Sequence, residues 1–169
     1  MKKFISIVDT VTDKIVFIQQ QLANLLLLFI MVLISMDVLG RNLFNKPLQG
    51  SYEVTELSSA LLVFFALAIT HKVNDHITID FVMTKLPERV QQIVYGFVEL
   101  VITIVLFFMA KQVYGNGVRM MNSGVTTTDL GIPIYPALFI ITFAIIVFAF
   151  VSIMKMLKHW GLAVERHES

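Results

Sequence analysis

Cysteine is absent from the chain, and its absence excludes several kinds of site at once. A protein without cysteine has no disulfide, no thiolate-bound metal and no cysteine nucleophile. Charged residues are also scarce, at 15% of the 169 residues, whereas soluble domains carry about 25%. The formal net charge of +1 gives no indication of a nucleic-acid partner. Apolar residues, in contrast, make up 57% of the chain, which indicates a protein surrounded by lipid.

Four apolar stretches are long enough to cross a bilayer, which requires roughly 20 mostly apolar residues. We place membrane-spanning helices at residues 22–40, 51–71, 91–113 and 134–156. The second span must include the polar turns around Glu53 and Glu56, because its apolar core from Leu57 to Thr70 is short. The sequence therefore predicts an all-α integral membrane protein, with a single membrane domain over residues 1–169.

An amphipathic helix is expected ahead of the first span, over residues 4–20. Its apolar residues recur at spacings of four and three, as they do on one face of a helix. We interpret it as a helix lying in the membrane interface, and a seam for a coiled-coil partner is the alternative. The Leu-rich run begins only at Leu22 and ends without a small-residue cleavage site, so we expect an uncleaved first span. The stripe consists of Phe4, Val8, Val11, Ile15, Ile18 and Leu22.

The distribution of Lys and Arg predicts the orientation. With four spans, the two termini and the 71–92 connection share one side, which holds nine of the 13 basic residues. The other side holds four. Because basic residues are enriched in cytoplasmic loops, both termini are expected in the cytoplasm.

The stretch from Ile69 to Asp80 is unusually polar for such an oily chain. Its His71, Asp75 and His76 could be read as metal ligands, but the sequence has no second cluster that would complete a metal site. We instead predict a structured cytoplasmic loop, in which His76 and Asp80 bind neighbouring parts of the chain.

Acidic residues near the span ends need partners. Asp37 and Arg41 are four residues apart, which suits a local ion pair, and Arg41 could also reach Glu53 or Glu56. These two glutamates begin the second span, where the helix dipole favours acids. A polar contact with a partner subunit is the alternative for both.

Glu99 is the deepest acid, and an intramembrane carboxylate is a candidate functional residue. A single carboxylate without a second charged group at mid-membrane makes a poor transport pathway. We expect Glu99 to be protonated or hydrogen-bonded to a neighbouring helix or water, with proton or ion coupling as the alternative. No span has the paired Gly or Pro interruptions of a transporter core. No G-x-S-x-G, Walker or zincin motif occurs either, so we predict no enzyme activity and no catalytic, substrate-binding or metal-binding residue.

An ordered set of residues resembles the small membrane subunit of tripartite ATP-independent periplasmic (TRAP) transporters. The pattern is an arginine, a Phe-Asn stretch, a proline and an acid pair, then an apolar helix with a basic end and a His-Ile-x-Ile-Asp element. The resemblance covers residues 22–156 and departs at Tyr52, where the family often has tryptophan or serine-glutamate. The matching residues are Arg41, Phe44, Asn45, Pro47, Glu53, Glu56, Lys72, His76, Ile77, Ile79, Asp80 and, before the last helix, Leu130, Gly131, Ile132 and Pro133.

The resemblance implies a transporter of three components in the bacterial inner membrane. A periplasmic binding protein captures an organic acid, and a large permease subunit moves it with a sodium gradient. The small subunit binds the large one stably and meets the binding protein transiently. Sodium ions are then expected in the large subunit, and no cofactor in this chain. A C4-dicarboxylate, a keto acid and a sialic acid all stay open as the substrate.

The resemblance also directs attention to the second span. Its small residues Ser59, Ala66 and Thr70 are expected to face the large permease, with Glu56 at the rim and Arg41 close by. The candidate structural or subunit-interface residues are therefore Asp37, Arg41, Glu53, Glu56, Ser59, His76, Asp80, Glu99, Gly131 and Pro133.

Two other functions compete with this interpretation. The first is a haem-bearing or structural membrane anchor of a respiratory complex. Ligation of haem by two histidines requires them inside facing spans, whereas all four histidines lie at or beyond the predicted helix ends. The second is a stand-alone exporter that uses Glu99 as a proton-coupled carboxylate.

Overall fold

A computed structural model describes residues 2–73 and 87–165, with side chains for 12–73, 87 and 90–161. These residues form four helices: α1 (Lys2–Phe44), α2 (Ser51–Val73), α4 (Glu88–Ser123) and α5 (Tyr135–Glu165). The part of the chain described contains no β-strand, and its one isolated bridge joins Thr126 to Pro133. The all-α prediction is confirmed. His76 and Asp80, with their predicted loop contacts, lie outside the described residues.

Each helix has the length and composition to cross a membrane, over Thr12–Phe44, Ser51–Val73, Val90–Ser123 and Tyr135–Gly161. The four-span prediction is therefore confirmed, although α4 continues ten residues past the predicted end at 113. Polar residues such as Lys111 interrupt the apolar run without stopping the helix. The helix ends at Gly124, which has a left-handed backbone (φ 60°). This conformation lets the N–H of Gly124 bond the Met121 carbonyl and the N–H of Val125 bond the Met120 carbonyl.

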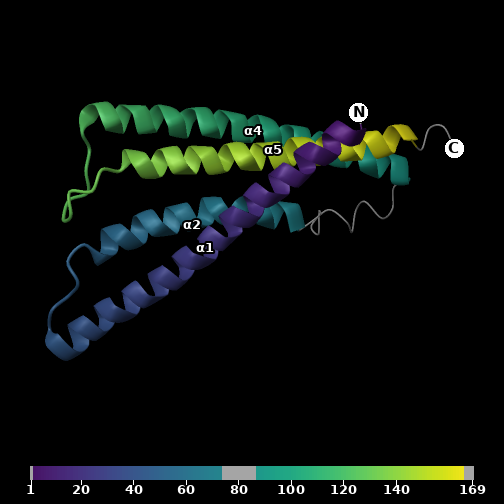
Figure 1. Cartoon of the computed structure of the whole chain (residues 1–169). Coiled ribbons are helices and arrows are strands. Elements are labelled where there is room, and N and C mark those ends of the chain that lie inside the picture. Colours follow the sequence, from purple (N-terminus) through teal and green to yellow (C-terminus); the bar gives the residue numbers. More distant parts are fainter. Residues whose placement is uncertain (1, 74–86, 166–169) are drawn as a thin grey trace.

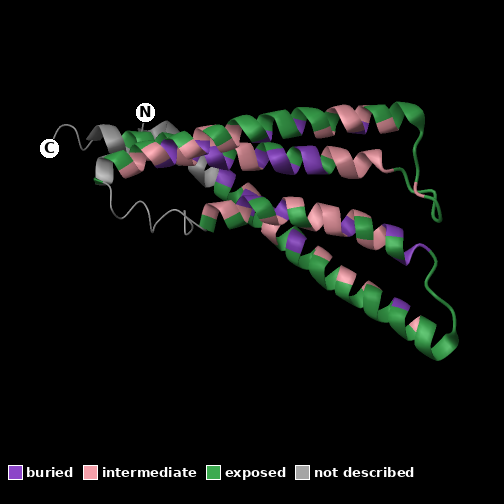
Figure 2. Ribbon diagram, turned by 180° about the vertical axis from the view of Figure 1, so that it is seen from behind, coloured by how far each residue is buried: buried purple, intermediate pink, exposed green. Residues whose placement is uncertain are grey.

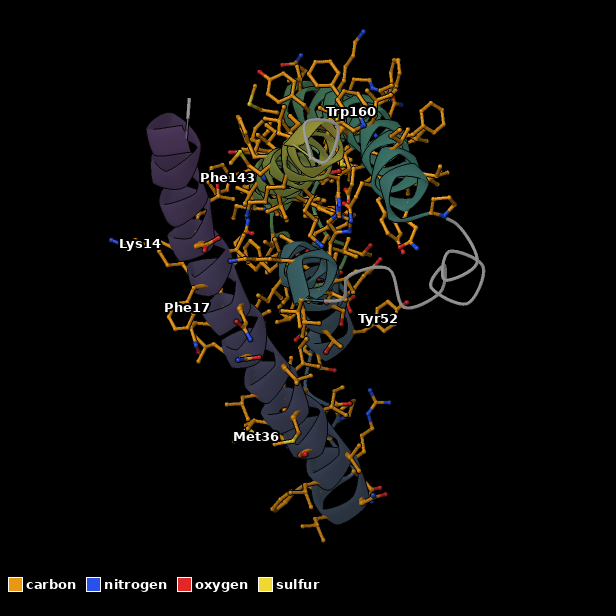
Figure 3. The ribbon with its side chains drawn as sticks, turned by 90° about the vertical axis from the view of Figure 1, so that its right-hand side faces the viewer. Lys14, Phe17, Met36, Tyr52, Phe143 and Trp160 are labelled. Carbon is orange, nitrogen blue, oxygen red and sulfur yellow. The ribbon has the colours of Figure 1, made fainter. Side chains whose placement is uncertain are left out.

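The helices pair as two antiparallel hairpins, α1 with α2 and α4 with α5 (Figure 1). The connections 45–50 and 124–134 lie at one end of the bundle, which we call the loop end, and the N- and C-terminal helix ends lie at the other, the termini end. α1 crosses α2 obliquely and stands at the edge of the bundle (Figures 1 and 3). The orientation of these two ends relative to the cytoplasm stays a prediction.

The core forms where α2 and α5 meet the other helices. Figure 2 shows the buried residues gathered along α5, whereas the C-terminal half of α1 is mostly exposed. One cluster joins α1, α2 and α5, a second joins α4 to α5, and a third joins α1, α2 and α5 again. Their buried members are Val16, Ala68, Val147 and Val151; Leu106, Ala110, Ile141 and Ile145; and Ala23, Phe65 and Ala144.

The predicted interfacial helix and the first span are one uninterrupted helix. Gln21 and its neighbours contain no glycine or proline that would break it. Ile18 and Leu22 of the predicted apolar stripe are 57% and 41% exposed, while the bundle receives a different stripe: Thr12, Val16, Gln19 and Ala23. In lipid, apolar side chains gain little by facing inward, so a helix can turn small and polar residues towards its neighbours. A location in the membrane interface stays a prediction.

Candidate functional site

Among the side chains that the structure describes, three carboxylates are buried: Asp37 (9% exposed), Glu53 (8%) and Glu99 (0%). All three were candidates from the sequence. Burying a carboxylate is costly unless hydrogen-bond donors surround it. The partners of each one therefore indicate what it does.

Asp37 holds the turn between α1 and α2. Its Oδ2 accepts a hydrogen bond from Nε of Arg41 at 2.8 Å, which confirms the predicted ion pair, and its Oδ1 accepts one from the backbone N–H of Leu48 at 2.8 Å. The chain reverses between these contacts through Asn45, which has a left-handed backbone (φ 50°). Among the described residues Arg41 forms no ion pair with Glu53 or Glu56, so that alternative is wrong.

Glu53 holds the other connection at the loop end. Its two oxygens accept hydrogen bonds from the backbone N–H groups of Asp129, at 2.6 Å, and Leu130, at 3.1 Å. Leu130 also covers Gly50, where a Cβ atom would lie 2.3 Å from the Leu130 Cγ atom. Glu56, one turn further along α2, is exposed. The two glutamates therefore have different surroundings, although they are only three residues apart.

The predicted Leu-Gly-Ile-Pro motif forms the turn that Glu53 holds. Gly131 has a left-handed backbone (φ 65°), and its N–H bonds the carbonyl of Thr127 at 3.2 Å. Thr127 in turn bonds Ile132 through backbone and side chain, while Pro133 bridges to Thr126. The motif thus closes a compact loop, and the backbone N–H groups of Asp129 and Leu130 donate from this loop to Glu53 of α2.

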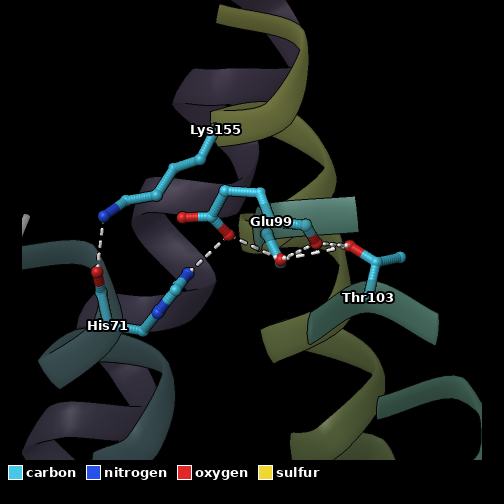
Figure 4. Close-up of polar contacts among 5 residues, drawn as sticks. His71, Glu99, Thr103 and Lys155 are labelled. Carbon is cyan, nitrogen blue, oxygen red and sulfur yellow. Dashed lines mark hydrogen bonds and ion pairs between the residues drawn. The ribbon is translucent and has the colours of Figure 1, made fainter. Parts of the chain in front are cut away.

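Glu99 joins three helices at the termini end (Figure 4). Its Oε2 lies 2.9 Å from Nε2 of His71 on α2 and accepts a hydrogen bond of 2.7 Å from the Ser152 hydroxyl on α5. Thr103 bonds the backbone carbonyl of Glu99 and approaches Ser152 at 3.1 Å. Lys155 of α5 donates to the His71 carbonyl at 2.6 Å.

The expectation of a hydrogen bond from a neighbouring helix to Glu99 is therefore confirmed by Ser152 of α5, and His71 of α2 is a partner that the sequence did not indicate. His71 ends one span and Glu99 lies early in the next, so both are near the same end of the bundle, and helix packing brings them together. His71 was the first ligand of the metal site considered from the sequence, but its Nε2 atom is engaged with the Glu99 carboxylate. Within the described residues no group of three potential metal ligands occurs.

Aromatic residues mark the depth of Glu99. Trp and Tyr are enriched at membrane–water interfaces. Tyr95 and Tyr114 of α4 are separated by about 28 Å of helix, which matches a hydrocarbon core of about 30 Å. Glu99 lies one turn beyond Tyr95, about 6 Å along the helix. Trp160 of α5 packs against Gly96 at the same level, where a Cβ atom would lie 2.1 Å from the indole nitrogen.

Two other expectations change with the geometry. The small residues of α2 do not form one open face, because Ala66 packs against the Ala23, Phe65 and Ala144 cluster while Thr70 is exposed. Ser59 is half-buried, and its contact with a partner stays a prediction. The two histidine side chains that the structure describes contact Glu99 and Gln92, which weighs against the haem alternative.

Comparison with known proteins gives a family match and one relative. The family model described as tripartite ATP-independent periplasmic transporters, DctQ component, matches residues 30–162. The chain is similar to the sialic acid TRAP transporter permease protein SiaT of Haemophilus influenzae (strain 86-028NP), with 24% identity over 105 residues. The alignment covers 62% of this chain and 16% of that much longer relative. No solved structure matches the chain.

Proposed function

Because the chain belongs to the DctQ component family of tripartite ATP-independent periplasmic transporters, we propose that it is the small permease subunit that supports the large one. In this role it holds the large subunit in the membrane and does not itself carry the solute. The observation that carries this proposal is that the buried carboxylates are all engaged in contacts within the chain. Asp37, Glu53 and Glu99 each bond groups on other parts of the same chain. They brace the bundle and are not presented to a solute.

The large permease subunit is the stable partner in this proposal. The relative SiaT supports it, since a segment similar to this chain occupies only 16% of that longer permease polypeptide. Two units that occur within one polypeptide in one protein and apart in another commonly act together. A periplasmic binding protein is the transient partner, and sodium ions bind in the large subunit.

The proposed location is the bacterial inner membrane, with both termini in the cytoplasm. The greater number of Lys and Arg at the termini end supports this orientation. The transported solute is an organic acid, and a C4-dicarboxylate, a keto acid and a sialic acid fit the family equally. This chain carries no cofactor and catalyses no reaction.

The test is uptake by cells that contain the large permease and its binding protein. Succinate, pyruvate and sialic acid serve as labelled probes, with sodium present or replaced by potassium. The proposal predicts that sodium-dependent uptake of one probe is lost on removal of this chain and returns when it is supplied again. Unchanged uptake without the chain would refute the proposal.

A further inference from the structure

One face of α1 is left uncovered by the rest of the bundle. The buried residues of this helix, among them Val16, Gln19 and Ala23, follow one stripe. At 3.6 residues per turn, a second stripe lies almost opposite to it. Figure 3 shows Lys14 and Phe17, which begin this second stripe, pointing away from the other helices. Its exposed members, at spacings of three and four, are Lys14, Phe17, Gln21, Asn24, Leu28, Met31, Ser35, Val38 and Asn42.

Two contacts locate this stripe along the bundle. At the termini end, Asp13 of α1 forms an ion pair with Lys72, in the last turn of α2. At the loop end, Asp37 bonds the backbone of Leu48, just before α2 begins. Asn24 lies between them, about 17 Å along the helix from Asp13 and about 20 Å from Asp37. It is therefore close to the mid-depth of the four-helix bundle, with Gln21 one turn nearer the termini end.

The amides of Gln21 and Asn24 have no hydrogen-bond partner within the part of the chain that the structure describes. Several other polar residues on the spans do have one, although the buried amide of Gln19 does not among the described residues. Ser35, for example, bonds the Met31 carbonyl at 2.7 Å, and Thr70 bonds the Ala66 carbonyl at 2.9 Å. Hydrocarbon offers no donor or acceptor, so two exposed amides at this depth are unfavourable in lipid alone.

We propose that the stripe of α1 centred on Gln21 and Asn24 binds a membrane-spanning helix of the large permease, and that this helix supplies hydrogen-bond partners to both amides. The inference rests on the proposed function and adds the surface that performs it. Asn and Gln are effective in helix association because each offers both donors and an acceptor. Leu28 and Met31, on the same stripe, supply the apolar packing beside them. The permease is chosen over a second copy because the relative carries a similar segment within a larger permease polypeptide.

Neighbouring leucines provide a matched test of this surface. Leu27 and Leu28 are 58% and 57% exposed and lie at the same depth, but point about 100° apart around the helix. The photoreactive residue p-benzoylphenylalanine is placed at one position or the other in the affinity-tagged full chain, in membranes that contain the large permease. The products are identified by mass spectrometry after illumination. We expect a crosslink to the permease from position 28 and little from position 27.

Other products would overturn the inference. Equal crosslinking to the permease from both positions would show that the contact is not confined to the stripe. A crosslink between copies of the chain would make the stripe a self-association surface, and lipid adducts alone would make it a lipid-facing one. Recovery of the permease with the unmodified chain separates the two proposals. If the permease is not recovered at all, the proposed function fails. If it is recovered but position 28 does not crosslink to it, only this inference fails.

A substitution test is independent of the photoreactive residue. Asn24→Leu and Gln21→Leu remove the amides and suit a lipid environment, so the chain itself should fold normally. Each is expected to lower recovery of the permease about three- to tenfold, as the loss of an interhelical hydrogen bond would. Leu27→Ala is the control and should leave recovery unchanged. Wild-type recovery in both amide variants would contradict the inference.

Discussion

The imidazole of His71 and the carboxylate of Glu99 lie 2.9 Å apart and join the end of α2 to α4 inside the bundle. The His71 ring also packs against Phe148 of α5, with ring centroids 5.0 Å apart. On the same α2 end, Lys72 pairs with Asp13 of α1. Every helix thus contacts this short segment, which makes it the main connection between the two hairpins at the termini end.

Removal of either member of this pair should destabilise the chain. Glu99 is fully buried, and removing one partner of a buried pair costs about 3 kcal/mol. We expect His71→Ala and Glu99→Leu each to lower the melting temperature of the purified chain in detergent. The double variant should lose less than the sum of the two losses. Strictly additive losses would show that the two residues are not coupled.

Glu53 should hold the 124–134 connection, whereas Glu56 should not. Glu53→Ala removes the charged acceptor of the two backbone hydrogen bonds from Asp129 and Leu130. Hydrogen–deuterium exchange should then become faster at the amides of Asp129 and Leu130. Glu56→Ala is the matched control, three residues away and exposed, and should leave these amides unchanged. Equal exchange in the two variants would contradict the contact.

Gln19 offers a stabilising substitution. Its side chain is 3% exposed, and among the described residues neither its Nε2 nor its Oε1 has a hydrogen-bond partner. A buried polar group without a partner costs about 1–3 kcal/mol. Gln19→Leu should therefore raise the melting temperature in detergent, while Gln21→Leu, on the exposed face, should change it little in the isolated chain. A lower melting temperature for Gln19→Leu would contradict this account of the side chain.

Reporter fusions test the orientation. The Lys and Arg distribution places the loop end in the periplasm. A reporter active only in the periplasm should therefore be active when fused after Lys46 or Asn122. It should be inactive after Lys85 or Ser169. The opposite pattern would invert the bundle, and a mixed pattern would contradict the four-span arrangement.

The sequence predicted most where the physical cause is local. Four spans follow from the long apolar runs that a bilayer requires, and the Asp37–Arg41 pair follows from a spacing of four residues on one helix. The end of α4 was missed because a polar residue such as Lys111 ends an apolar run, whereas the helix itself stops at the cap formed by Gly124. The apolar composition therefore predicts which part of the helix lies in the membrane, whereas the backbone geometry at Gly124 determines where the helix ends.

The contacts between distant parts of the chain could not be predicted. Glu99 meets His71 only after α2 and α4 pack with their ends level, and no sequence spacing encodes that. Glu53 likewise bonds the backbone of Asp129 and Leu130, whose N–H groups carry no sequence signature at all. Gln19 turned inward because neighbouring helices, and not the apolar pattern of α1, decide which face is covered in lipid.

The most direct measurement of the central claim is the composition of the complex purified from native membranes. The full chain, tagged at one terminus, is extracted in mild detergent, and its mass is determined by native mass spectrometry with identification of every component. The account predicts one copy of this chain with one copy of a large multi-span permease. Recovery of the chain alone, as an oligomer of itself, or with a haem-containing enzyme would contradict it.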